Sequence, residues 1–243
     1  MKTSDNLAKN REEYPSQAQE SFQKNSAILM IEALCKLHGV ENVPKIIEDL
    51  ESCGFAFEKT LDTYIKTASD DNSLIGKSSH QLLKAGGKKL RPMVLSLIAG
   101  KEPKSKEAVY KLASAIELIH SATLLHDDVM DLGETRRKNP TSRMLYGNNA
   151  SILAGDQLLI DAIRSFSNHK PELLEDTLST IEKMIHAEAL QLENSKKFPW
   201  PKELHQKICE GKTASLFALG CKTGAAFGNY SEKQIQLFSE FGF

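Results

Sequence analysis

The apolar positions of this 243-residue chain recur mostly at spacings of three and four, the pattern of amphipathic helices. The clearest segment runs from Ser105 to about Met130, contains no Gly or Pro, and is followed by Gly133 as a stop signal. Its periodic positions include Val109, Leu112, Ala113, Ile116, Ile119, Leu124 and Val129. Alternation with a period of two is rare and β-branched residues do not cluster, so strands are not expected.

The same periodicity predicts several further helices along the chain. They are expected at Phe55–Ser69, Leu74–Lys84, Pro92–Ala99, Asn149–Ser167, Pro171–Glu193, Lys202–Phe227 and from Ser231 onward. Lys196 to Pro201, with Trp200 between two prolines, predicts a loop. Residues 1–25 are polar and predict a disordered segment, and residues 26–52 are expected to add one or two helices. The fold class is therefore all-α, with one dominant domain over residues 26–243.

Composition and charge narrow the possible functions. A formal net charge of −1 argues against a general nucleic-acid binder, which usually carries a basic excess. The longest early apolar stretch, Ala27 to Leu34, is too short to span a bilayer, and the first 25 residues lack the apolar core of a signal peptide. The four scattered cysteines are typical of reduced cytoplasmic thiols: Cys35, Cys53, Cys209 and Cys221. We expect a cytoplasmic protein with no transmembrane segment and no nucleic-acid partner.

An acidic motif closes the clearest helix. Asp127 and Asp131 are one turn apart and share a face, and Asp128 is adjacent to Asp127. Like charges at this spacing destabilise a helix by about 0.2–0.5 kcal/mol. A hard divalent cation would offset that repulsion, and Mg²⁺ usually combines one or two carboxylates with substrate phosphates. Taken alone, the spacing is more often that of a solvated acidic helix end.

Basic residues flank this motif. His120 lies two turns before Asp127, and Arg136, Arg137 and Lys138 follow shortly after Gly133. Carboxylates that hold a cation beside guanidiniums that hold phosphate oxygens suit a metal-bridged polyphosphate. The alternative is that the arginine pair simply neutralises the acidic patch.

Two further basic motifs are weak when taken singly. GGKKLRP, from Gly86 to Pro92, places three cations on a turn that opens a helix, and helix N-termini favour anions. A solvated basic turn is the more common explanation. Lys212 and Thr213 can bind phosphate, but the upstream glycine of a P-loop is absent, so ordinary helix surface is the alternative.

Taken together and in order, GGKKLRP, ELIHSATLLHDDVMDLGETRRKNPT, GNNASILAGDQLL and GKTASLF resemble the trans-isoprenyl (polyprenyl) diphosphate synthase family. The resemblance runs from about Phe55 to the C-terminus. It implies an antiparallel helix bundle around a central cavity, usually in a homodimer. The implied reaction condenses an allylic diphosphate with isopentenyl diphosphate to give a longer trans-polyprenyl diphosphate.

The resemblance also implies roles for individual residues. Asp127 and Asp131 would hold Mg²⁺ on the allylic diphosphate, with Asp128 in support. Isopentenyl diphosphate would be bound by four residues: Lys88, Arg91, His120 and Arg137. The allylic diphosphate would be faced by Arg136, Lys212 and Thr213. Cationic groups of this kind stabilise a departing diphosphate, so that the allylic C–O bond ionises and no protein nucleophile is needed.

Product length is predicted from the turn before the acidic motif. In the family, residues at this position form the floor of the cavity, and bulky aromatics there stop chain growth. Ala122 and Thr123 occupy it here, and their small size favours a longer product. The alternative is that Ala122 is small only because helices pack closely around it.

The sequence departs from the family near its C-terminus. A second Asp-rich motif is expected there, but no Asp follows Asp176 and the chain ends at Phe243. We therefore expect a C-terminally incomplete bundle that binds Mg²⁺–diphosphate weakly and turns it over poorly. A truncated synthase is favoured. A partner-dependent, non-catalytic subunit of a heteromeric synthase, or a diverged binding protein, are the alternatives.

Overall fold

The computed structural model describes residues 45, 60–100, 102–197 and 199–243. All of them belong to one compact unit, Pro44–Phe243. The predictions of disorder in residues 1–25 and of helices within 26–52 lie outside the described residues.

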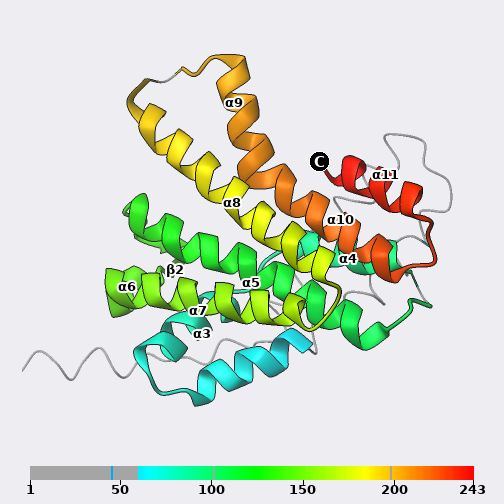
Figure 1. Cartoon of the computed structure of the whole chain (residues 1–243). Helices are drawn as coiled ribbons and strands as arrows, with labels where there is room; N and C mark the ends of the chain where they lie inside the picture. Colours follow the sequence, from blue (N-terminus) through cyan, green and yellow to red (C-terminus); the bar gives the residue numbers. More distant parts are fainter. Residues whose placement is uncertain (1–44, 46–59, 101, 198) are drawn as a thin grey trace, which may run out of the picture. The chain divides into compact units, whose positions relative to one another are not determined.

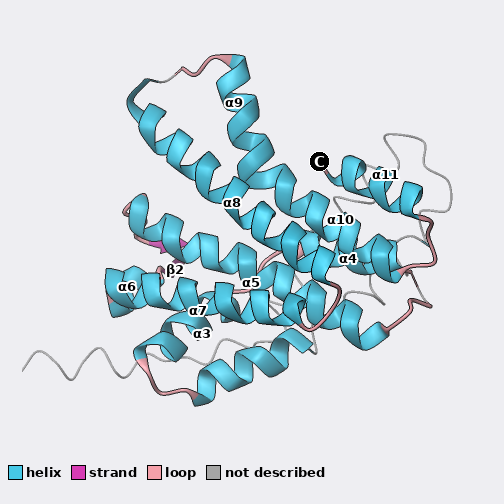
Figure 2. Cartoon of the chain, in the orientation of Figure 1, coloured by secondary structure: helices cyan, strands magenta, loops and turns pink. Residues whose placement is uncertain are grey.

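The described elements are almost entirely helical, which confirms the all-α class (Figures 1 and 2). They comprise a helix over residues 60–70, α3 (Leu74–Lys84), α4 (Leu90–Ala99), α5 (Lys106–Met130), α6 (Ser142–Tyr146), α7 (Asn148–Ser167), α8 (Pro171–Asn194), α9 (Lys202–Cys209), α10 (Ser215–Phe227) and α11 (Glu232–Gly242). The described strands, β1 (Thr135–Arg136) and β2 (Asn139–Pro140), form a small antiparallel hairpin. None of the described helices is apolar enough over a sufficient length to cross a membrane.

The predicted and observed boundaries agree closely for α3, α5, α7 and α8. The predicted helix over Lys202–Phe227 is interrupted, because a π-helical turn, Glu210–Ala214, separates α9 from α10. Helix α4 begins at Leu90, two residues earlier than predicted, and Pro92 then lies in its first turn, where a missing N–H costs little. The hairpin and α6 were not predicted, since two to five residues are too few to show a period.

Serine caps explain where several helices begin. The Ser73 hydroxyl accepts a hydrogen bond from the Gly76 N–H at the start of α3, and Ser105 accepts one from Ala108 at the start of α5. Helix α11 opens with a reciprocal capping box between Ser231 and Gln234. These side chains satisfy backbone donors that a helix leaves unpaired in its first turn.

Helix α5 forms the centre of the core. It contacts α7, α4 and α10, and Leu112, Ile116, Ile119 and Leu125 on it are fully buried. Helix α7 approaches closely at Gly155, where an added Cβ would clash with the His126 ring. This packing holds α5 firmly along its length, so the charged residues of its C-terminal half have defined positions.

Candidate functional site: two charged clusters along α5

The acidic motif occupies the last turn of α5. Asp131 caps the helix, and its N–H donates to the Asp127 carbonyl at 2.8 Å, which places the two residues one turn apart. The Asp127 side chain is 13% exposed, whereas Asp131 is exposed to solvent. One carboxylate is therefore held in the protein while the other faces outward.

Lys212, in the π-helical turn between α9 and α10, links the acidic motif to α8. Its ammonium lies 3.5 Å from the Asp127 carboxylate and also contacts the Glu188 carboxylate of α8. The π-helical turn that carries Lys212 packs on α8 because Gly211 has no Cβ; an added one would lie 2.6 Å from the Cβ of Ala187. Such π-helical turns occur frequently at functional sites. Sequence reasoning missed Glu188, because no motif or spacing links it to Lys212.

The charges of this acidic cluster influence one another. Burial raises the pKa of Asp127; Lys212 opposes that shift, while Glu188 and Asp131 add to it. Burial acts to lower the pKa of Lys212, but its contacts with Glu188 and Asp127 outweigh burial and raise it. Lys212 therefore remains a firmly charged ammonium that partly balances two neighbouring carboxylates.

The donor set fits a hard divalent cation. Carboxylate oxygens are the ligands that Mg²⁺ prefers, and Mg²⁺ is usually held by one or two of them together with substrate phosphates. Within the described ranges, no three acidic, His or Cys side chains are arranged to hold a metal. Asp127 and Asp131 can thus supply two ligands, and a cation here needs further oxygens from a bound ligand.

Asp128 and Arg136 form a separate, partly buried ion pair. The Arg136 Nε donates to both carboxylate oxygens of Asp128 at 3.0 and 3.1 Å, and Nη2 donates to Oδ1 at 2.8 Å. Asp128 is 4% exposed. Arg136 therefore ties the β1–β2 hairpin to the end of α5, and its guanidinium is engaged by a carboxylate. The interpretation that the arginine pair neutralises the acidic patch fits Arg136, but Arg137 makes different contacts.

Arg137 belongs to a second, basic cluster. Its guanidinium lies against the turn before α4, where an added Cβ on Gly87 would be 2.8 Å from both Nη atoms. Arg91, in the first turn of α4, lies over the Phe217 ring at 4.7 Å from its centroid. The Arg91 Nε is buried and has no hydrogen-bond partner among the described residues. A buried, unpaired donor of this kind is suited to an anionic ligand.

Two α5 residues face this basic cluster with shifted pKa values. Burial, together with the charges of Arg91, Arg137 and Arg136, lowers the pKa of His120 to about 3. Burial raises the pKa of Glu117 to about 7, opposed by Lys89, Arg91 and Arg137. His120 is consequently a neutral imidazole at physiological pH, able to donate one hydrogen bond.

Backbone strain gathers around the same region. Among the described residues, the non-glycine residues with positive φ are Lys89, Leu132, Arg137 and Lys138, at 49°, 53°, 51° and 67°. Each flanks one of the two clusters. Arg137 and Lys138 form the two-residue turn of the hairpin, a position usually occupied by Asn or Gly. Strained residues of this kind persist where surrounding structure holds them, and they concentrate at functional sites.

The remaining predicted site residues lie in different environments. Lys88 and Thr213 are exposed. Ala122 is fully buried, whereas Thr123 is partly exposed and its hydroxyl donates to the His120 carbonyl at 2.8 Å. At about 100° per residue, Thr123 lies about 40° around the α5 axis from Asp127, and Ala122 about 140°. Only Thr123 is therefore on the side of α5 that carries the acidic motif.

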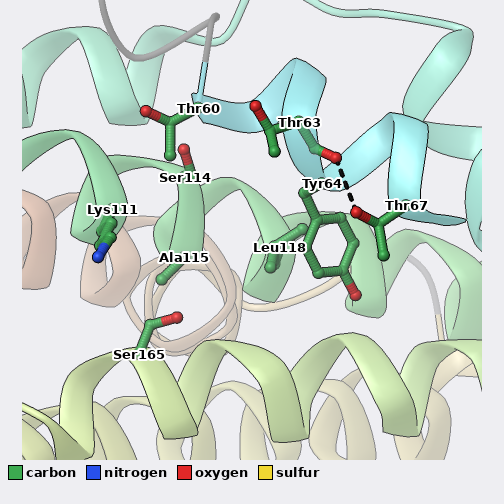
Figure 3. A pocket seen from close by; sticks show the side chains of 9 residues that line it. All are labelled: Thr60, Thr63, Tyr64, Thr67, Lys111, Ser114, Ala115, Leu118 and Ser165. Carbon is green, nitrogen blue, oxygen red and sulfur yellow. Dashed lines mark hydrogen bonds between the residues drawn. The ribbon is translucent and has the colours of Figure 1, made fainter.

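A hollow of about 440 Å³ lies elsewhere, between the helix over residues 60–70, α5 and α7 (Figure 3). Its walls carry hydroxyl groups from several threonines and serines, and the Tyr64 hydroxyl donates to Asp161 at 2.5 Å. Lys111 at its edge is paired with Glu107 on the same helix. None of the predicted site residues lines it, so it is separate from both charged clusters.

Comparison with known proteins gives a consistent result. The family model described as polyprenyl synthetase matches residues 72–243. The chain is 32% identical over 186 residues to nonaprenyl diphosphate synthase of Mycobacterium tuberculosis, covering 76% of this chain and 55% of that protein. It is 34% identical over 172 residues to geranylgeranyl diphosphate synthase of Methanosarcina mazei, covering 68% and 53%. The chain thus spans about half the length of these curated relatives.

Solved structures of prenyl diphosphate synthases also resemble this chain. A decaprenyl diphosphate synthase from Rhodobacter capsulatus aligns with a TM-score of 0.71 and 28% identity, covering 80% of this chain and 61% of the other. A polyprenyl synthase from Caulobacter crescentus, complexed with calcium and isoprenyl diphosphate, aligns with a TM-score of 0.72 and 28% identity, covering 80% and 60%.

Proposed function

Because this chain belongs to the polyprenyl synthetase family, which its residues 72–243 match, we propose that it condenses an allylic diphosphate with isopentenyl diphosphate in isoprenoid biosynthesis. One observation carries the proposal. The basic cluster around Arg91 and the acidic cluster around Asp127 both adjoin the C-terminal half of α5, at His120 and at Asp127. A prenyl transfer requires two diphosphates close together, one of them held through a metal.

The basic cluster is the proposed site for isopentenyl diphosphate. Arg91 and Arg137 would provide guanidiniums, the exposed Lys88 would provide an ammonium, and neutral His120 would provide a hydrogen bond. The unpaired Nε of Arg91 supports this assignment, because an anion there would satisfy a buried donor. No metal is needed at this site, since the charge is supplied by side chains.

The acidic cluster is the proposed site for the allylic diphosphate. Asp127 and Asp131 would hold Mg²⁺, which when bound supplies the charge that stabilises diphosphate as a leaving group. Lys212 is positioned to contact phosphate oxygens beside the metal ligands, and Thr213 can add a hydrogen bond from the same turn. Asp128 and Arg136 support the site by fixing the end of α5. The calcium and isoprenyl diphosphate in the related Caulobacter protein support a divalent cation here.

Product length is proposed to depend on Thr123 more than on Ala122. Thr123 lies on the side of α5 that carries the acidic motif, so its small side chain leaves room for a growing prenyl chain. Ala122 is fully buried in the core, which fits the alternative that it is small for packing. We further place the protein in the cytoplasm, consistent with the free thiols of Cys209 and Cys221.

We also propose that the protein forms a homodimer through α7. Leu153 and Ile160 are two turns apart on one face of α7 and are 52% and 48% exposed. Met144 and Leu145 on the preceding α6 are similarly exposed. Large apolar side chains that gather on one surface are typical of protein interfaces. A heteromeric partner with a matching face is the alternative.

Binding measurements test the two proposed diphosphate sites. In calorimetry, we expect isopentenyl diphosphate to bind without Mg²⁺, and Arg91→Gln to weaken it at least about tenfold, as for loss of a charged hydrogen bond. An allylic diphosphate should bind only with Mg²⁺. Asp127→Asn should abolish this Mg²⁺-dependent binding. Glu107→Gln, exposed on the same helix, should change neither. Unchanged binding in both site variants would refute the assignment.

A second candidate function is a diphosphate-binding chain that needs a partner for turnover. It is considered because, within the described residues, no third acidic, His or Cys side chain joins Asp127 and Asp131 in an arrangement that could hold a metal. An assay with radiolabelled isopentenyl diphosphate and an allylic diphosphate separates the two. Product from the purified chain supports the enzyme, product only after a partner chain is added supports the subunit, and binding without product under either condition supports neither.

A further inference from the structure

Glu117 occupies an unusual position inside the basic cluster. It is 7% exposed and forms no hydrogen bond or ion pair with any residue that the structure describes. Its side chain lines a small recess of about 10 Å³ together with Lys89, Arg137 and Ser121. Buried carboxylates are normally paired directly, because an unpaired one loses its hydration without compensation. The burial of this carboxylate without a direct partner therefore requires an explanation.

The groups around Glu117 come from several elements. Lys89 and Arg91 face it from the start of α4, and Arg137 faces it from the hairpin turn. The other lining side chains from α3 and the helix over residues 60–70 are leucines: Leu61, Leu82 and Leu83. His120, one turn along α5, is neutral. Glu117 is thus one carboxylate facing three cations, without a contact to any of them at ion-pair distance.

We propose that Glu117 is a positioning residue for the isopentenyl diphosphate site: its carboxylate balances Lys89, Arg91 and Arg137 while the site is empty, and it takes up a proton when a diphosphate assumes that role. This inference rests on the proposed function, because it needs a diphosphate at the basic cluster. Glu117 itself would touch no reacting atom. It would act through the two guanidiniums, by holding them near each other despite their like charge.

The direction of the linkage follows from charge. The pKa of Glu117 is raised to about 7 by burial, so the group is half ionised at pH 7 when the site is empty. A bound diphosphate adds negative charge nearby and favours the protonated form. Binding at pH 7 should then be accompanied by uptake of about half a proton at Glu117. Ionisation of this group should weaken the affinity for isopentenyl diphosphate about tenfold as the pH rises from 6 to 8. His120 is neutral over that range while the site is empty, and any proton that it takes up on binding is shared by wild type and Glu117→Gln.

Calorimetry in two buffers of different ionisation enthalpy measures this proton uptake directly. Wild-type protein, Glu117→Gln and Glu107→Gln would each be titrated with isopentenyl diphosphate at pH 7 without Mg²⁺. We expect Glu117→Gln to take up about half a proton less than wild type, and to lose the associated pH dependence between pH 6 and 8. Glu107→Gln, on the exposed side of α5, should match wild type.

Three other results would overturn the proposal. Equal proton uptake in wild type and Glu117→Gln would remove the role of Glu117 while leaving the binding site intact. Absence of any binding heat in wild type would remove the proposed site as well, so the two failures are distinguishable. If Glu117→Gln does not fold, carbon-13 NMR of labelled glutamate carboxyls in wild type replaces it, with the resonance assigned from Glu117→Asp. A titration midpoint that does not rise on saturation with isopentenyl diphosphate would then overturn the proposal.

Discussion

His120 and Glu117 lie one turn apart on α5, and burial shifts their pKa values in opposite directions. Burial disfavours whichever form is charged, so the base loses its proton more readily and the acid retains it. Arg91 and Arg137 are near both residues, and their charges strengthen the shift of the histidine and oppose that of the glutamate. The basic cluster therefore contains a neutral imidazole and a carboxyl group that titrates near pH 7, one turn apart on α5.

The pKa of His120 predicts acid sensitivity of the fold. Below pH 6.5 the unfolded chain binds a proton at this histidine, whereas the folded protein does not until about pH 3, so stability falls as pH falls through that window. At pH 5 this loss amounts to about 2 kcal/mol. Between pH 7.5 and 5, the melting temperature of His120→Gln should fall by about 4–8 °C less than that of wild type. Circular dichroism measures both melting temperatures.

His186→Gln serves as the control for this measurement. His186 is on α8 with a side chain 77% exposed, so its replacement should leave the pH dependence of wild type unchanged. Equal acid sensitivity in wild type and His120→Gln would contradict the assignment of a buried neutral imidazole.

At the scale of elements, the β1–β2 hairpin brings two adjacent arginines to different partners. Arg136 lies in β1 and turns toward the buried Asp128, while Arg137 lies in the two-residue turn with positive φ and reaches Gly87. Successive residues on a strand point to opposite sides, and the turn changes the direction again. One arginine therefore stabilises the end of α5, and the other belongs to the proposed ligand site.

This arrangement predicts a clear difference between two matched variants. Arg136→Gln leaves the Asp128 carboxylate buried without its partner, which should destabilise the protein by about 3–5 kcal/mol. Arg137→Gln should cost little stability but weaken isopentenyl diphosphate binding. Urea denaturation and calorimetry on both variants measure the two effects. The hairpin assignment would be wrong if Arg137→Gln proved the more destabilising change.

At the scale of the whole molecule, exposed apolar side chains on α6 and α7 support the proposed dimer. Four large apolar side chains there are each about half exposed: Met144, Leu145, Leu153 and Ile160. By contrast, the face of α7 toward α5 is fully buried at Ala154, Leu158 and Ala162. Helix α7 is thus apolar on two sides, which is the pattern of a helix between a core and an interface.

The proposed dimer is tested by charge on this surface. Leu153→Glu combined with Ile160→Glu should convert the dimer to a folded monomer, because two buried, unpaired carboxylates per subunit would oppose association. Analytical ultracentrifugation measures the change. Leu237→Glu, on the exposed side of α11, should remain dimeric. A monomeric wild-type protein at micromolar concentration would argue against the homodimer.

Local pattern alone identified most of the helices. Long periodic segments such as those of α5, α7 and α8 were predicted almost to the residue, because burial of one face requires apolar residues at the helical spacing. The hairpin and α6 were missed because they are too short for periodicity. The π-helical turn was missed because its sequence is an ordinary helical one, and the packing of Gly211 against α8 accounts for its position.

The sequence by itself determined the all-α class, the order of the motifs and the residue types suited to a diphosphate site. Tertiary structure decided which charges meet. Packing of the helices brings Lys212 into contact with both Asp127 and Glu188. It also pairs Arg136 with Asp128, and it buries Glu117 and His120 near Arg91. The physical reason is distance along the chain. Contacts within a helical turn follow from backbone geometry, whereas partners tens of residues apart depend on how helices pack, and burial then decides their ionisation.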